Sequence, residues 1–240
     1  MLNILIDYDN IALGDSRIAT REIDYLIDII FDGLQKHSLD YKKYRFRLYG
    51  GWYINKNMTR KAQNIVAQIQ NKYPVVKKIQ SEGFAKQVVL EVELAYSIMK
   101  KPEKHLFNTY RIRDCNVSFK FNHPIKLGCM KTDCPLLIVS KIINENKCCH
   151  NDCNHSLDGM INKGEQKLVD NMISIDMACL SDLDECRDIV LVSSDDDFLP
   201  ALIFSCIKNK RVLHISSGGM LVGYDLTFLG NRYIAEAIGG

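Results

Sequence analysis

The sequence predicts an α/β protein built on a central, mainly parallel β-sheet. Short apolar runs of strand length alternate along the chain with stretches whose apolar residues recur at helical spacing. The first run, Leu2 to Ile6, ends in Asp7, as expected of a buried parallel strand with a functional residue at its carboxyl end. Such alternation favours parallel strands connected by right-handed helical crossovers.

The first part of the chain predicts a β-α-β-α-β series. In its first helix, isoleucine and leucine recur every three or four positions and form one apolar face. The elements expected here are a strand at 2–6, a helix at 22–34, a strand at 44–49, a helix at 59–73 and a strand at 74–79. Residues 86–96 are compatible with either a strand or a short helix.

An irregular insertion is expected at 100–160, after which the α/β rhythm resumes. The elements expected after it are a helix at 165–180, a strand at 188–192, a helix at 198–208, a strand at 212–215 and a short helical stretch after Gly223. We therefore expect one domain whose halves are residues 1–99 and 161–240, with the insertion between them.

Composition excludes several classes of protein. The 240 residues carry a net charge of +2, with 47% hydrophobic and 25% charged residues. These values are typical of a globular protein and not of a disordered tail or a fibre. No apolar run approaches the ~18 residues of a membrane helix, and the N-terminus lacks the features of a signal peptide. We expect a cytoplasmic protein that does not associate with membranes.

Charge is distributed unevenly along the chain. Between Lys36 and Gln87, twelve lysines and arginines stand against two acids, whereas between Asp170 and Asp197 nine acids stand against one arginine. This asymmetry suggests a polyanion held next to cations, and ordinary solvated faces explain the basic stretch equally well. The candidates for contacts with an RNA backbone are Lys42, Lys43, Arg45, Arg47, Arg60 and Lys61. Trp52 or Tyr53 would stack on a base if exposed, and we expect one of them in the core.

Acidic side chains follow two of the expected strands. Asp7, Asp9 and Asn10 come at the end of the first strand, and 195–197 come after the strand at 188–192. If these strands are neighbours, their acids converge at the edge of the sheet where ligands bind. Asp170 begins the preceding helix, and Asp176 lies roughly 120° around that helix from it.

Converging carboxylates repel one another unless a divalent cation neutralises them. Oxygen ligands select Mg²⁺ or Mn²⁺ over softer metals. The alternative for any single aspartate is capping or turn formation, and Asp197, shortly before a helix, is an example.

The acidic segments resemble the three signature blocks of NYN-domain proteins, a branch of the PIN-like nuclease superfamily. The blocks are Ile4 to Asn10, Glu165 to Asp170 with Asp176 six residues later, and Val190 to Pro200. The third, which is similar to the family pattern S-G-D-S-D-F-x-P, is the most specific. Leu168 and Ser194 stand where the family usually has Gly, and the long middle insertion is the largest departure.

The resemblance implies a Rossmann-like PIN/NYN domain, a Mg²⁺ or Mn²⁺ site and ribonuclease activity. It points to a metal site formed by Asp7, Asn10, Asp170, Asp195 and Asp197, with Asp176 as a candidate additional member. Asp7, Asp170 and Asp195 would hold the metal directly or through water. Asn10 and Asp197 would orient those ligands, and Asp197 joins the other three aspartates as an expected catalytic residue.

The insertion contains six of the nine cysteines. Paired cysteine clusters are able to fix one tetrahedral Zn²⁺, which would stabilise a segment with little apolar content. The expected zinc ligands are Cys129, Cys134, Cys149 and Cys153, with Cys148, Cys115, His150 and His155 as substitutes. Reduced cysteines without metal are the alternative. Cys179, Cys186 and Cys206 lie in apolar segments and are expected to pack in the core.

The sequence thus predicts a metal-dependent ribonuclease with RNA as its partner, and leaves a homo-oligomer or a protein partner open. One alternative is a non-catalytic RNA-binding or regulatory protein that keeps the same fold. Another is a haloacid dehalogenase-type phosphatase, in which Asp7 would be a covalent nucleophile and Asp9 its acid/base. The phosphatase mechanism leaves Asp170 without a role.

Overall fold

The structure is a computed structural model. It describes residues 1–11, 23–37, 39–81, 84–114, 134–145, 147–148, 153, 155, 162–216 and 224–238. The chain divides into two units, Met1–Tyr110 with Gln166–Gly240, and Arg111–Glu165. The first unit carries the α/β sheet, and the second contains helix α3 (Pro135–Glu145).

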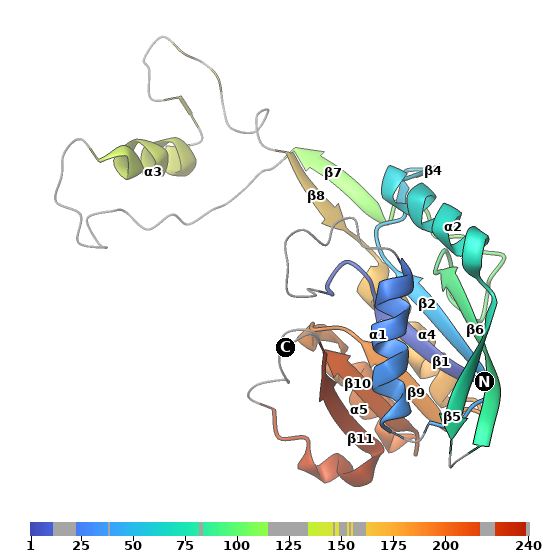
Figure 1. Ribbon diagram of the computed structural model, residues 1–240. Helices are drawn as coiled ribbons and strands as arrows, with labels where there is room; N and C mark the ends of the chain where they lie inside the picture. The colour runs from blue at the N-terminus through green and yellow to red at the C-terminus, as the bar shows by residue number, and fades with distance from the viewer. Residues whose placement is uncertain are drawn as a thin grey trace. The chain divides into compact units, whose positions relative to one another are not determined.

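A seven-stranded sheet forms the centre of the first unit (Figure 1). Its strands are β1 (Leu2–Asp7), β2 (Lys43–Tyr49), β5 (Val75–Ser81), β6 (Phe84–Leu94), β9 (Asp188–Val192), β10 (Arg211–Ser216) and β11 (Tyr233–Ala237). They are arranged in the order β11-β10-β9-β1-β2-β6-β5. Every neighbouring pair is parallel except β5 and β6. The expected α/β class with a mainly parallel sheet is confirmed.

The strand order reverses at β1. On one side of β1 lies β2, followed by β6 and then by β5 at the edge, so the chain reaches the edge strand before it fills the place beside β2. The chain then adds β9, β10 and β11 outward on the other side of β1. β1 therefore pairs with both β2 and β9, with Asp7 opposite Tyr49 and Ile6 opposite Val192. Ligands of open α/β sheets bind beyond the carboxyl ends of the strands at such a reversal.

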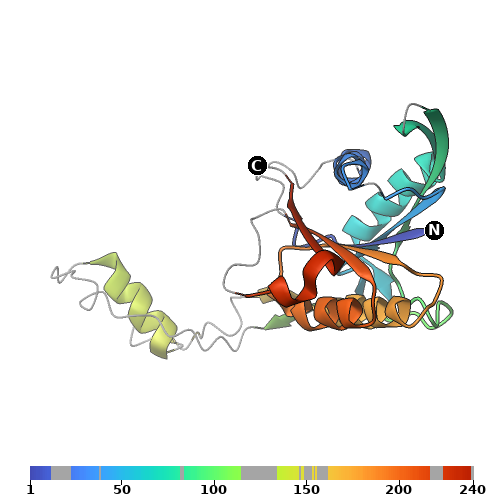
Figure 2. The same cartoon turned by 90° about the horizontal axis from the view of Figure 1, so that it is seen from below.

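Helices cover both faces of the sheet (Figure 2). They are α1 (Ile23–Gln35) and α2 (Arg60–Lys72) on one face, and α4 (Val169–Ser181) and α5 (Leu199–Ile207) on the other. Side chains of β1 alternate between the two cores, because Ile4 and Ile6 pack with α1 whereas Leu5 packs with α4. The same alternation puts Asp7 on the α4 face. No helix in the described ranges is long and apolar enough to cross a membrane.

Local sequence explains where the helices begin. The Thr59 hydroxyl oxygen accepts a hydrogen bond from the Ala62 N–H at 3.2 Å and caps α2. Pro200 lies in the first turn of α5, where a backbone N–H has no helical partner to lose. α4 has no such cap, because Leu168 precedes it with a left-handed backbone (φ 71°) and no side-chain capping bond.

Strand β5 corrects the expectation of a wholly parallel first half. It runs antiparallel to β6, from Val75 opposite Leu90 to Ser81 opposite Phe84. Only two residues separate the two strands, and a connection that short joins antiparallel strands, whereas a parallel crossover needs a dozen residues or more. Residues 86–96, open between strand and helix, belong mostly to β6.

Three further features differ from the elements that the sequence predicts. The short helical stretch expected after Gly223 is present as the 3₁₀ segment η5 (Thr227–Arg232), and it is followed by strand β11, which the sequence analysis does not predict. The helix expected from 165 begins at Val169, since β8 (Asn162–Gln166) pairs with β7 (Tyr110–Asp114). Residues 53–58 form a small antiparallel hairpin of β3 (Tyr53–Ile54) and β4 (Asn57–Met58).

Truncation of α4 at buried and exposed positions tests the packing of this helix. Ile173 is fully buried, whereas Ile175 is 45% exposed two residues later. We expect Ile173→Ala to lower the free energy of unfolding by about 2–5 kcal/mol, because the substitution leaves a cavity. Ile175→Ala, the matched control, should change it by less than about 1 kcal/mol. Urea unfolding measures both, and equal losses would contradict the described packing.

Candidate active site

The pairing of β1 with β9 brings together two of the expected acidic segments. Asp7 ends β1, and Ser193 follows β9 at the same edge of the sheet. The Ser193 hydroxyl donates a hydrogen bond to Asp7 Oδ2 at 2.9 Å. The condition set for convergence of the acids, that these two strands are neighbours, is therefore met.

Asp7 is fully buried, and only one of its oxygens is hydrogen-bonded. Oδ2 accepts bonds from Asn10 Nδ2 at 2.8 Å and from Ser193, whereas Oδ1 has no hydrogen-bond partner among the described residues. The pKa of Asp7 is raised to about 6, mainly by burial; the hydrogen bonds from Asn10 and Ser193 lower it, and the charges of Asp170 and Asp195 add to the increase. A buried carboxylate oxygen without a donor is energetically unfavourable, and a bound cation would offset that cost.

The loop after β9 holds Asp195 close to Asp7 through Ser193. The Asp195 N–H donates to Ser193 Oγ at 3.1 Å, so one hydroxyl contacts both acidic residues. Asp195 Oδ1 in turn accepts from the Asp197 N–H at 3.0 Å and caps the 3₁₀ turn η4 (Asp196–Phe198). The capping role considered for Asp197 therefore belongs to Asp195, and the Asp197 side chain is exposed.

Asp170 lies in the first turn of α4. Desolvation raises its pKa, the charges of Asp195 and Asp197 raise it further, and Lys167 lowers it. The positive end of the helix dipole also favours a carboxylate at this position. Asp170 therefore belongs to the same electrostatic group as Asp7 and Asp195.

These four aspartates, Asp7, Asp170, Asp195 and Asp197, are an electrostatic cluster and not a closed ligand set. Within the described ranges, no three or more histidine, cysteine, aspartate or glutamate side chains are arranged to hold a metal ion. The donors are nevertheless carboxylate and amide oxygens, which suit Mg²⁺ or Mn²⁺. The partnerless Oδ1 of Asp7 and the mutual repulsion within the cluster fit a divalent cation there.

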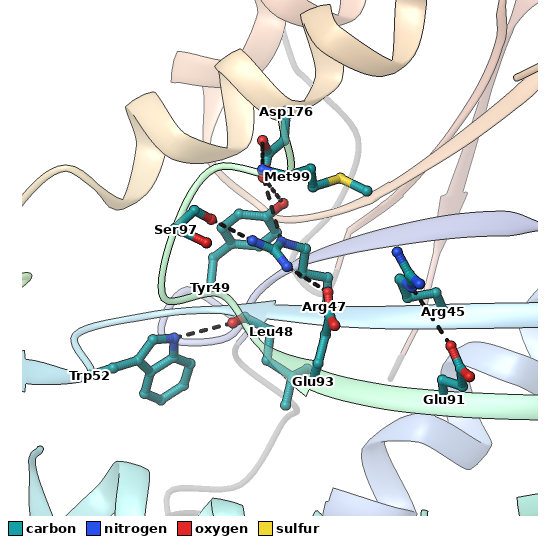
Figure 3. A network of polar contacts seen from close by, with 10 residues as sticks. All are labelled: Arg45, Arg47, Leu48, Tyr49, Trp52, Glu91, Glu93, Ser97, Met99 and Asp176. Atoms are coloured by element: carbon teal, nitrogen blue, oxygen red, sulfur yellow. Dashed lines mark hydrogen bonds and ion pairs between the residues drawn. The ribbon is translucent and has the colours of Figure 1, made fainter. Parts of the chain in front are cut away.

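The structure does not bring Asp176 into this cluster. Asp176 is fully buried, and its two oxygens accept bonds from the Tyr49 hydroxyl at 2.6 Å and the Met99 N–H at 2.7 Å (Figure 3). Arg47 Nε lies 3.5 Å from Oδ2. Desolvation raises the pKa of Asp176, and the Tyr49, Met99 and Arg47 contacts lower it. Asp176 thus ties α4 to β2 and to the segment after β6.

Three of the expected RNA-binding cations pair with acids across the sheet. Lys43 and Arg45 contact Glu91 at 2.7 and 3.7 Å, and Arg47 contacts Glu93 at 2.5 Å. Strand register explains the pairs, since Arg45 lies opposite Glu91 and Arg47 opposite Glu93 (Figure 3). Arg47 is also buried, which removes it from the surface.

The other three expected cations lie nearer to the solvent. Lys42 and Arg60 are exposed. Lys61 forms an ion pair with Asp9 and lies 4.8 Å from the centre of the Tyr8 ring. Desolvation lowers the pKa of Lys61 to about 8, although 47% of its side chain remains exposed.

Base stacking by Trp52 or Tyr53 finds no support in the structure. Trp52 is fully buried with its indole N–H bonded to the Leu48 carbonyl at 3.1 Å, and Tyr53 is 8% exposed. One of the two was expected in the core, and both are there.

Half of the expected zinc ligands lie outside the described residues. Cys129 and Cys149 lie outside them, whereas Cys134 and Cys153 are described and are free thiols. Cys153 Sγ lies 3.3 Å from Nδ1 of His155, one of the expected substitute ligands. The zinc site remains a prediction. Of the cysteines expected in the core, Cys186 and Cys206 are buried and Cys179 is half-buried.

Sequence reasoning assigned no role to Ser193 or His214. Ser193 bridges Asp7 and Asp195, and its place directly after the apolar run of β9 was the available signal. His214 is buried on β10 with Nε2 2.9 Å from the Ser193 carbonyl oxygen and Nδ1 3.2 Å from the Tyr233 hydroxyl. A single histidine in an apolar strand gives no signal of such a contact.

Comparisons with known proteins find no relative. No family model matches the chain, and neither a curated protein nor a solved structure shows significant similarity to it. Conclusions about its activity therefore depend on the residues and their geometry.

The raised pKa of Asp7 predicts a pH-dependent cost to the metal-free fold. The pKa of Asp7 is about 6 in the folded state and about 3.9 in the unfolded state. Ionisation of Asp7 therefore lowers the free energy of unfolding; this loss is absent below pH 4, grows between pH 4 and 6, and is complete above pH 6. Asp7→Asn should therefore stabilise the protein at pH 8 in EDTA by up to about 3 kcal/mol, with the gain disappearing toward pH 4. Urea unfolding across this range measures it. The exposed Asp32→Asn is the control, and a pH-independent effect of Asp7→Asn would contradict the assignment.

Removal of the Asp176 carboxylate should damage the fold and leave metal affinity unchanged. Asp176→Ala leaves Arg47, the Tyr49 hydroxyl and the Met99 N–H without the carboxylate that they contact. We therefore expect the free energy of unfolding to fall by about 3–5 kcal/mol. Asp182→Ala, at the exposed end of the same helix, should cost less than about 1 kcal/mol. A variant with unchanged stability and lost Mn²⁺ binding, measured by calorimetry, would instead make Asp176 a ligand.

Proposed function

We propose that this chain is a metal-dependent ribonuclease of the NYN branch of the PIN-like superfamily. It would hydrolyse RNA phosphodiester bonds at the carboxylate cluster. The observation that carries the proposal is the buried Asp7 carboxylate at the reversal of strand order, one oxygen of which has no partner in the described part of the chain. Asp170 and Asp195 raise its pKa from neighbouring elements.

The residues would divide the work as follows. Asp7, Asp170 and Asp195 would hold Mg²⁺ or Mn²⁺, while Asn10 and Ser193 fix Oδ2 of Asp7 by hydrogen bonds. Such a cation, when bound, neutralises charge, activates water and stabilises the leaving oxygen. Asp197 contributes its N–H to the orientation of Asp195, and its exposed carboxylate adds negative charge to the site.

The backbone at Leu168 supports the family proposal. Its left-handed conformation costs an L-residue roughly 1–2 kcal/mol, whereas glycine adopts it freely. This is a position at which the resembled family usually has glycine. The backbone conformation of Leu168 is thus one that glycine would favour. It directs the chain into α4 just before Asp170.

The exposed Lys42 and Arg60 and the half-exposed Lys61 are the remaining candidates for the RNA backbone. Any contribution of the paired Lys43 and Arg45 would require separation from Glu91. A structural Zn²⁺ at Cys129, Cys134, Cys149 and Cys153 is part of the same proposal.

The phosphatase alternative fits the geometry less well. It needs Asp9 as a free acid/base beside Asp7. Asp9 Oδ2 instead accepts a hydrogen bond from the Gly51 N–H at 3.0 Å, and Lys61 pairs with the same carboxylate. Asp9 is therefore engaged in joining the end of β1 to the turn after β2.

Cleavage of single-stranded RNA, structured RNA and tRNA tests the proposal. We expect cleavage with Mg²⁺ or Mn²⁺ and none in EDTA. Asp195→Asn should reduce the rate roughly 100-fold or more, because the variant loses part of the metal's stabilisation of the transition state. The neighbouring and exposed Asp196→Asn is the matched control and should retain most of the activity.

Other outcomes would redirect the assignment. RNA binding without cleavage under every metal condition would favour the non-catalytic alternative. Metal-dependent hydrolysis of a phosphate monoester, with a trapped aspartyl-phosphate, would favour the phosphatase. Equal loss of activity in Asp195→Asn and Asp196→Asn would contradict the roles proposed for the loop after β9.

A further inference from the structure

An open pocket of about 750 Å³ lies at the amino ends of β9 and β10, away from the carboxylate cluster. Its charged lining residues are the acids Asp184 and Asp188 and the cations Arg187, Lys208, Lys210, Arg211 and Arg232. Five cations and two acids give the lining a formal charge of +3. The volume is within the range of small-molecule sites.

Three of these cations lie on adjacent chain segments at this edge of the sheet: the β10–β11 register extends to Arg211 beside Arg232, whereas Asp188 lies opposite Arg211 and Arg187 precedes Asp188 by one residue. Arg187 precedes β9, Arg211 begins β10 and Arg232 precedes β11. The Arg211 N–H donates to the Arg187 carbonyl at 2.9 Å, and the β10–β11 pairing begins one residue later. Since neighbouring strands are about 4.8 Å apart, the three arginine backbones form a row about 10 Å long.

The two acids of the pocket differ in their surroundings. Asp188 is buried, and its two oxygens accept bonds from Arg211 Nε at 2.5 Å and from the Tyr41 hydroxyl. Asp184 is exposed. One acid thus neutralises one arginine, and the positive charge of the pocket remains in excess.

Helix ends explain two of the five cations. The C-terminal ends of α4 and α5 are negative through their dipoles and attract cations. Lys208 pairs with Asp182 at 3.0 Å, and Lys210 Nζ donates to the Leu183 carbonyl at 2.7 Å. The same explanation reaches Arg232 only through the short 3₁₀ segment η5, which it ends, and it does not reach Arg187, which directly precedes β9. Both arginines are exposed. The described contact of the Arg187 side chain is with the neutral Tyr41 hydroxyl.

We propose that this pocket is an anion-binding site for a ligand with two or more linked phosphate groups. Guanidinium groups bind phosphate through paired hydrogen bonds, and a row about 10 Å long suits more than one phosphate. The site is separate from the proposed active site, because the length of β9 puts about 17 Å between the two edges of the sheet. Its occupant is either a free polyphosphate, such as a nucleotide, or the phosphate backbone of an RNA strand.

Binding of pyrophosphate, ATP and a 12-nucleotide RNA tests the proposal, with EDTA present to remove any metal. Calorimetry or fluorescence anisotropy gives the dissociation constants. We expect Arg187→Gln/Arg232→Gln to weaken binding of at least one probe roughly tenfold or more, because charged hydrogen bonds are lost. Both side chains are exposed, so the fold should be retained, and circular dichroism checks this.

A charge-matched control separates a site from general electrostatics. Lys56→Gln/Lys104→Gln removes two positive charges from exposed positions outside the pocket and should leave binding within about twofold. Selective loss of pyrophosphate or ATP binding would identify a free ligand, and selective loss of RNA binding would identify a nucleic acid backbone. Absence of binding for all three probes, or equal weakening in both double variants, would overturn the proposal.

Discussion

The parallel pairing of β1 with β9 is the constraint on which the candidate site depends. It makes β1 a central strand, so that Asp7 ends a strand with neighbours on both sides and is fully buried. Burial of a carboxylate is unfavourable unless donors or a cation offset it. Two hydrogen bonds reach one oxygen of Asp7, and no residue that the structure describes donates to the second oxygen. The same strand pairing that builds the core therefore buries a carboxylate at the edge of the sheet whose negative charge is only partly compensated.

Opposite charges lie at the two edges of this half of the sheet. Beyond the carboxyl ends of β1 and β9 lie the acids around Asp7 and Asp195, whereas arginines gather at the amino ends of β9, β10 and β11. Parallel strands make this separation possible, because every strand start lies at one edge and every strand end at the other. A negatively charged ligand is favoured directly at the basic edge. At the acidic edge it is favoured only together with a cation.

Periodicity in the sequence was sufficient for the class of fold and most of its elements, because burial on a strand or a helix leaves a period of two or 3.6. It did not reveal the direction of β5, which depends on the two-residue connection to β6. The sequence did not predict β11, because Tyr233–Ala237 is half-buried at the sheet's edge and lacks a continuous apolar run. The pairing of Arg45 with Glu91 was also hidden, since strand register, and not residue type, decides it.

Asp7 and Asp176 show how a structural carboxylate differs from a candidate ligand. Both are fully buried, both follow signature-like patterns, and desolvation raises the pKa of both. Asp176 has a donor on each oxygen and an arginine beside it, so its charge is balanced within the fold. Among the residues described, Asp7 has donors on one oxygen only, and the charges that act on it are those of other aspartates. Burial alone therefore does not distinguish the two roles; the number and sign of the neighbours do, and by that criterion Asp7 is the residue whose environment a bound cation would complete.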